Sequence, residues 1–119
     1  MAQFTTHLLS SVDGRHAAGV PIRIVQRTPG RADIELVAGT SDTGGRFSAE
    51  ITPQAPTPDT RYEFAVATAH YFADVTGARP VVVDEITVRF ALPDPTARYH
   101  MPLMIAPNSH SLWWSPPGG

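Results

Sequence analysis

Apolar and polar residues alternate along most of this chain with a period of two, which is the pattern of strands that bury one face. The alternation is clearest in Tyr62–Val66 and Ile86–Phe90, where the large apolar side chains fall on the same face. Further segments of strand character are residues 4–9, 20–26, 33–40, 46–51, 98–106 and 109–114. About eight short strands are typical of a sandwich of two sheets, so we predict an all-β fold.

Turn-forming residues separate these segments. The 12 prolines and 9 glycines are spread along the chain, which disfavours long helices. Asp13-Gly14 and Thr43-Gly44-Gly45 tolerate positive φ angles, and the proline-rich residues 53–58 lack the N–H groups that a central strand needs. Only residues 68–77 show apolar positions at helical spacing, and they predict one short helix that stops at Gly77.

The length and charge of the chain limit its organisation and its partners. With 119 residues, it is long enough for one core, and we expect one β-sandwich domain over residues 1–114 followed by a Pro/Gly tail over residues 115–119. The formal net charge of -2 provides no basic surface for nucleic acid or an anionic membrane. No apolar segment reaches the roughly 20 residues of a membrane span, and the first residues do not resemble a secretion signal. We therefore expect a soluble, cytoplasmic protein.

The absence of cysteine excludes disulfides and thiolate chemistry, so the histidines must carry most of any chemistry near neutral pH. These are His7, His16, His70, His100 and His110. They form no HxH or HxxxH pair and have no carboxylate at a characteristic ligand spacing, so we predict no metal site. No GxSxG motif marks a nucleophilic serine, and Ser109 and Ser111 are interpreted as ordinary strand residues.

His100 lies in the mostly apolar segment Tyr99–Pro107, two positions before Pro102. A proline in such a segment is expected on an edge strand or where two molecules meet. Taken singly, His7 and His100 are more often core histidines with a satisfied ring, and Arg46 is more often a solvated charge. Considered without any related protein, His7, Arg46 and His100 could therefore be ordinary structural residues or members of a catalytic site.

Five segments together resemble the signature motifs of the transthyretin-related 5-hydroxyisourate hydrolases. The first, Thr5–Leu9, is similar to T-T-H-V-L-D, and Gly14–Val20 is similar to G-x-P-A-x-G-V. Thr40–Arg46 resembles the T-x-x-D-G-R turn, and Tyr99–Pro107 resembles Y-H-x-P-L-L-L-S-P. The last match, in the helix region, is Tyr71-Phe72 followed by Thr76-Gly77. Order and spacing agree from about residue 4 to residue 111.

This resemblance implies a transthyretin-like β-sandwich that forms a homotetramer, with active sites in the channel where dimers meet. His7, Arg46 and His100 stand at the positions of the family's two catalytic histidines and its arginine. The resemblance further implies that the two histidines activate water and transfer protons, while Arg46 holds an anionic oxygen of a small cyclic substrate. Opening the ring of 5-hydroxyisourate in purine breakdown requires this set and no metal or cofactor.

The chain departs from the family pattern at its C-terminal end and at two turns. The family usually ends in S-Y-S-T-Y-R-G-S, and the resemblance implies that Ser111, Trp113 and Trp114 contact the substrate. Trp113 stands in place of the tyrosine of this ending, and Trp114 stands in place of its arginine. His16 stands where the family has proline, and Gly44 replaces the aspartate of the D-G-R turn. Three hypotheses remain: a hydroxyisourate hydrolase with a variant tail, a paralogue acting on a more apolar cyclic substrate in a biosynthetic pathway, and a noncatalytic carrier of small molecules.

Overall fold

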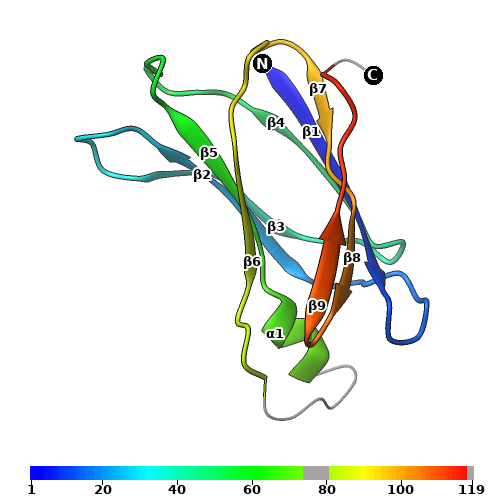
Figure 1. Ribbon diagram of the computed structural model, residues 1–119. Coiled ribbons are helices and arrows are strands. Elements are labelled where there is room, and N and C mark those ends of the chain that lie inside the picture. Colours follow the sequence, from blue (N-terminus) through cyan, green and yellow to red (C-terminus); the bar gives the residue numbers. More distant parts are fainter. Residues whose placement is uncertain (74–80, 118–119) are drawn as a thin grey trace.

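The computed structural model describes residues 1–73 and 81–117 and contains two β-sheets packed face to face (Figure 1). One sheet has the strand order β4-β1-β8-β9 with β7 also paired to β1, and the other has the order β3-β2-β5-β6. The elements are β1 (Ala2–Ser10), β2 (Pro21–Arg27), β3 (Ile34–Thr40), β4 (Arg46–Ile51), β5 (Arg61–Val66), α1 (Thr68–Tyr71), β6 (Ile86–Phe90), β7 (Arg98–His100), β8 (Leu103–Ala106) and β9 (Ser109–Leu112). The predicted all-β sandwich with one short helix is confirmed.

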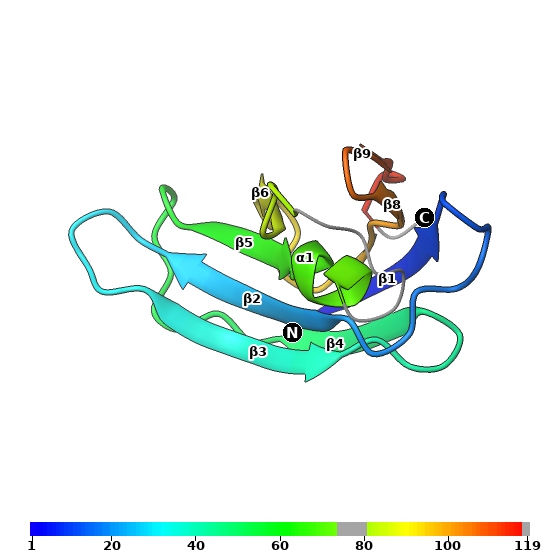
Figure 2. The same ribbon diagram turned by 90° about the horizontal axis from the view of Figure 1, so that it is seen from below.

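The single helix of the described residues follows β5 at the lower end of the molecule in Figure 1, and Figure 2 shows the same end from below. It covers Thr68–Tyr71, so its start agrees with the prediction, while positions 74–77 of the predicted helix lie outside the described residues. Tyr71 and Phe72 are both buried and their rings meet edge to face. No helix among the described residues is long and apolar enough to cross a membrane.

The core fills the space between the inner faces of the two sheets. Phe4 of β1 lies at its centre, with its ring 4.8 Å from that of Phe64 and 5.9 Å from that of Phe90, measured between centroids. Along β1 the odd and even positions alternate in burial, as the period-two pattern predicts. The buried positions face the core, and Thr5, His7 and Leu9 therefore project from the outer face of the sheet.

The segment 98–106 forms two short strands instead of the single strand predicted. β7 and β8 both run parallel to β1 in one continuous register, with Tyr99 opposite Phe4 and Leu103 opposite Leu8. The strand is interrupted at Met101 and Pro102, although the Met101 N–H still donates to the Thr5 carbonyl at 3.0 Å. Pro102 lies between β7 and β8 and is buried, and its carbonyl accepts a hydrogen bond from the Trp113 N–H at 3.3 Å. The expectation that it lies on an edge strand or where two molecules meet stays a prediction.

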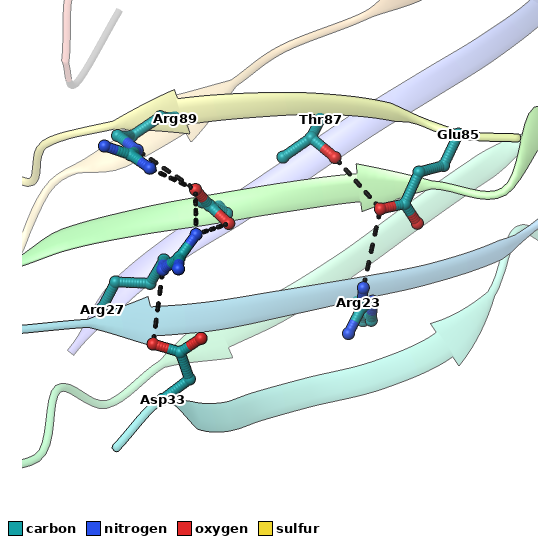
Figure 3. A network of polar contacts seen from close by, with 7 residues as sticks. Arg23, Arg27, Asp33, Glu85, Thr87 and Arg89 are labelled. Atoms are coloured by element: carbon teal, nitrogen blue, oxygen red, sulfur yellow. Dashed lines mark hydrogen bonds and ion pairs between the residues drawn. The ribbon is translucent and has the colours of Figure 1, made fainter. Parts of the chain in front are cut away.

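The outer face of the other sheet carries charges that pair with one another (Figure 3). Glu63 of β5 accepts hydrogen bonds from Arg27 of β2 and Arg89 of β6, and Arg27 also contacts Asp33. Burial acts to raise the pKa of the Glu63 carboxyl, but the hydrogen bonds and charges of the two arginines outweigh it and lower this pKa. These guanidinium groups are thus engaged by carboxylates of the same face.

Candidate functional site

Three strands bring the predicted catalytic residues to the outer face of the β4-β1-β8-β9 sheet. His7 of β1 pairs with Arg46 of β4, and Thr5 of β1 pairs with His100 of β7. Paired positions project to the same side of a sheet, and Thr5 and His7 are two residues apart on one strand. His7, Arg46 and His100 therefore occupy one surface although up to 93 positions (100 minus 7) separate them in the sequence.

A tight turn delivers Arg46 to the start of β4. The Asp42 carboxylate accepts hydrogen bonds from the backbone N–H groups of Gly44 and Arg46, each at 2.9 Å. Gly45 has a φ of 73°, and a side chain at this position would collide with the Leu8 carbonyl oxygen of β1. Glycine is therefore required here both by conformation and by the close approach of the turn to β1.

The Arg46 guanidinium is exposed and makes no hydrogen bond or ion pair with a residue of the described ranges. It differs in this from Arg27 and Arg89 on the opposite face, which share Glu63. An unpaired guanidinium beside two imidazoles is available to bind an anionic or developing negative oxygen.

His100 is held by β1 through its ring. Its Nδ1 lies 2.7 Å from the Thr5 Oγ1, which leaves Nε2 for other contacts. A threonine hydroxyl both donates and accepts, so the same contact supports either tautomer of the ring. His100 and Arg46 line one cavity of about 360 Å³ together with Thr5, Thr6, Asp42, Phe47 and Ser48.

The His7 ring lies beside this cavity and contacts His16. Its Nε2 is 2.9 Å from the His16 Nδ1, and the rings stack with centroids 5.0 Å apart. The pKa of His7 is lowered from its ordinary value of 6.5, first by burial and then by the charge of Arg46, with smaller effects of His16 and His100 and an opposing hydrogen bond with the Gly44 backbone. His7 is thus kept neutral near neutral pH and able to accept a proton.

The family model described as "HIUase/Transthyretin family" matches residues 4–114. The chain belongs to the HIUase/transthyretin family. It is 31% identical over 110 residues to the 5-hydroxyisourate hydrolase of Deinococcus radiodurans, with 92% of each chain covered. Among solved structures, the Klebsiella pneumoniae 5-hydroxyisourate hydrolase matches with a TM-score of 0.69 and 25% identity over 98% of this chain and 100% of that one. Transthyretin from Sparus aurata matches with a TM-score of 0.77 and 21% identity over 94% and 95%, which confirms the transthyretin-like fold.

The positions predicted to contact substrate occupy two different places in this HIUase/transthyretin family member. Ser111 of β9 pairs with Met104, which pairs in turn with Leu9, so Ser111 belongs to the outer face that carries His7. Trp113 follows β9 and is 46% exposed, with its N–H bonded to the Pro102 carbonyl next to that face.

Trp114 lies on another side, as strand alternation predicts for adjacent residues. It is 69% exposed and lines a mostly apolar cavity of about 340 Å³ at the edge of the sandwich with Phe90, Tyr99, Met101 and Leu112. His100 lines this cavity as well as the polar one. His100 therefore stands between a polar and an apolar space.

Within residues 1–73 and 81–117 no group of three or more histidine or acidic side chains is arranged to hold a metal ion. The contact that sequence reasoning missed is that of His16 with His7. The sequence marked His16 only as a departure from the family proline. A signal was present in Asp13-Gly14, because a turn there returns the chain toward β1 and brings residues 7 and 16 side by side.

Proposed function

We propose that this family member is a hydrolase that opens a cyclic amide of the 5-hydroxyisourate type. The observation that carries the proposal is the convergence of His7, Arg46 and His100 on one sheet face from three strands. Family membership and the names of its relatives support the same reaction class. Each of these residues alone could have an ordinary structural role, but an arginine without an ion-pair partner among the described residues, next to two histidines, favours a catalytic role.

In the proposed reaction, a water molecule attacks a carbonyl carbon of the substrate ring. A neutral histidine accepts the water proton as the C–O bond forms, and Arg46 binds the oxygen that becomes negative. The ring C–N bond then breaks, and the histidinium gives the proton to the leaving nitrogen. Atoms and charge balance with water as the only co-reactant.

The two histidines are suited to different steps. The lowered pKa of His7 makes it a neutral proton acceptor. His100, with Nδ1 bonded to the Thr5 hydroxyl, presents its Nε2 and can change tautomer while that contact persists. We therefore assign water activation to His7 and assign to His100 the relay of that proton from the His7 imidazolium to the leaving nitrogen, so that both rings end neutral.

We also propose a homotetramer, with the sites at the interface between dimers. The outer face that carries the histidines also exposes apolar side chains, including Met104 at 40% and, beside it, Trp113 at 46%. Their contact with a second copy would cover apolar surface and exclude bulk water from the site. Light scattering at micromolar concentration should then give four times the protomer mass of 12.8 kDa, and a monomer would contradict the proposed channel.

Turnover of freshly generated 5-hydroxyisourate, followed by the decay of its ultraviolet absorbance, tests the proposed activity. The purified protein should accelerate this decay, and His100→Ala should lower kcat/KM by about a hundredfold because an acid–base group is lost. His110→Ala is the matched control, since His110 is an exposed residue of β9 outside the site. Equal turnover by the wild type and His100→Ala would remove the catalytic assignment.

The apolar cavity beside His100 favours a second candidate, a related hydrolase whose cyclic substrate carries an apolar substituent. The substituent would occupy the space next to Trp114 and Phe90 while the reacting ring lies near Arg46. Turnover of cyclic amides and esters with apolar side groups, compared with 5-hydroxyisourate under the same conditions, separates the two candidates. Tight binding of aromatic compounds with no turnover of either class would instead indicate a carrier.

A further inference from the structure

His16 lies against the proposed catalytic base. The distance of 2.9 Å between His7 Nε2 and His16 Nδ1, together with rings only 25° from parallel, describes a hydrogen bond between stacked imidazoles. The family motif given above has proline at this position, which has no side-chain nitrogen. The contact is therefore a property of this chain that the motif does not supply.

The backbone holds His16 in this place. The Ser10 N–H donates to the Arg15 carbonyl at 2.8 Å, and the Ala17 N–H donates to the Leu8 carbonyl at 2.9 Å, so hydrogen bonds to β1 lie on both sides of His16. Leu9 and His16 are themselves bridged as antiparallel partners. Because the main chain is tied to β1 on both sides of His16, the ring contact does not depend on a freely moving loop.

A hydrogen bond between two neutral imidazoles uses one proton and one lone pair. Either His16 Nδ1–H donates to the lone pair of His7 Nε2, or His7 Nε2–H donates to His16 Nδ1. The bond with the Gly44 backbone, which raises the pKa of His7, needs a proton on the other ring nitrogen and so belongs to the first arrangement. In the second arrangement this bond is released, and the His7 Nδ1 lone pair can take a proton from water while its Nε2 proton moves toward His16. His16 is exposed, so its other nitrogen is in contact with solvent.

The charges around the pair limit it to one additional proton near neutral pH. Arg46 of β4 and His100 of β7 both act to lower the pKa of His7, as does His16 itself. Asp42 faces the same cavity as Arg46, and on the loop of His16 the charges of Asp13 and Arg15 lie 3.9 Å apart and offset each other. A second proton would place two cations in contact beside Arg46, which is strongly disfavoured.

We propose that His16 is a positioning residue and proton partner of His7, and that the two imidazoles accept one proton as a unit. This inference rests on the proposed function for its catalytic consequence, but the pairing itself is a property of the free protein. His16 sets the orientation and tautomer of the His7 ring and shares the proton taken from water. Because His16 lowers the pKa of His7, the protonation of His7 depends on this neighbour.

The test combines NMR titration of the imidazole nitrogens of the full chain without substrate with pH–rate profiles of kcat and KM. In the wild type, the signals of His7 and His16 should each respond to the titration of the other. In His16→Ala, His7 should titrate at a higher pH, because the charge of His16, which lowers the pKa of His7, is lost. Its kcat should fall about tenfold with KM within about twofold, since the proposed role of His16 is exerted through His7.

His16→Gln separates positioning from proton sharing. Its amide can bond the His7 ring but cannot take up a proton, so kcat should recover to within about threefold of the wild type while the titration of His7 stays as in His16→Ala. His110→Ala should change neither readout. If His16→Ala leaves the His7 titration, its tautomer and the pH–rate profile unchanged, the pairing has no role and the proposal is overturned. Linked titration without turnover of 5-hydroxyisourate would contradict the proposed function and leave the pairing intact.

Discussion

Thr5 and His100 are 95 positions apart, and the Thr5 Oγ1 lies 2.7 Å from the Nδ1 of the His100 ring. The parallel pairing of β1 with β7 places the two residues opposite each other on the outer face. Thr5 is flanked on the same strand by Thr6, whose hydroxyl donates to the Met101 carbonyl in the interior. The two adjacent threonines thus have different roles. Thr5 binds the His100 ring of the site, and Thr6 satisfies the Met101 carbonyl where the strand is interrupted.

Replacing Thr5 by valine should lower kcat/KM about tenfold, because the loss of one hydrogen bond of roughly 1.4 kcal/mol leaves the His100 ring without its partner. Thr5→Ser keeps the hydroxyl and should remain within about threefold of the wild type. Steady-state kinetics with 5-hydroxyisourate provide the measurement. Equal losses in both variants would show that the methyl group, and not the hydroxyl, matters.

Replacing Arg46 by glutamine should raise the pKa of His7, since the positive charge of Arg46 is one of the causes that lower it. The neutral imidazole is the active form, so activity is expected to be lost as pH falls through this pKa, which lies below 6.5 in the wild type. The acid limb of the pH–rate profile should move to higher pH in Arg46→Gln, and the NMR titration of His7 should move with it. Arg31→Gln, which alters an exposed arginine bonded to the Ala55 carbonyl, should move neither.

Glu63→Gln should reduce the free energy of unfolding by about 1 kcal/mol at pH 7, because Glu63 joins Arg27 and Arg89 across three strands. Its pKa is lowered in the folded protein, so its contribution is present above the ordinary glutamate pKa of 4.5 and is lost as pH falls through the folded-state value. Urea unfolding of the two proteins at pH 7 and at pH 3 measures this. If the difference in unfolding free energy between the two proteins were larger at pH 3 than at pH 7, the predicted direction of the Glu63 pKa shift would be wrong. Glu50→Gln, at an exposed position of β4, is the control.

Trp114→Arg should weaken binding of apolar aromatic compounds by about tenfold and raise activity on 5-hydroxyisourate, because it removes an apolar wall of the cavity next to His100 and adds a cation. Trp113→Tyr, on the other side of the chain, should affect the aromatic compounds less. Fluorescence or calorimetric titration, with the oligomeric state checked by light scattering, gives both affinities. A variant that combines Trp113→Tyr with Trp114→Arg completes the test. If it keeps the oligomeric state of the wild type, and both its affinity for aromatic compounds and its activity on 5-hydroxyisourate remain within about twofold, the two tryptophans only pack an interface.

The face of each strand is a local property, and for that reason it could be predicted. Successive side chains of a strand point to opposite sides, so the strand predicted over residues 4–9 is found as β1, while the sequence left open whether His7 lies in the core. The segment 98–106 was predicted as one strand from its apolar residues, and the structure divides it into β7 and β8 at Met101 and Pro102. The roles of His7, Arg46 and His100 were implied by motifs in the sequence, and they stay predictions.

The sequence by itself determined the strands, their buried faces, the glycine turn before Arg46 and membership of the family, because each depends on residues that are close in the chain or on recognisable local motifs. Tertiary structure alone decided which residues meet. The bond of Thr5 to His100, the stacking of His16 on His7 and the unpaired state of Arg46 all follow from strand register and from the return of the chain after Asp13-Gly14. Register is set by long-range packing of two sheets on a shared core. The local sequence of one strand therefore does not show which residue of a distant strand will lie opposite it.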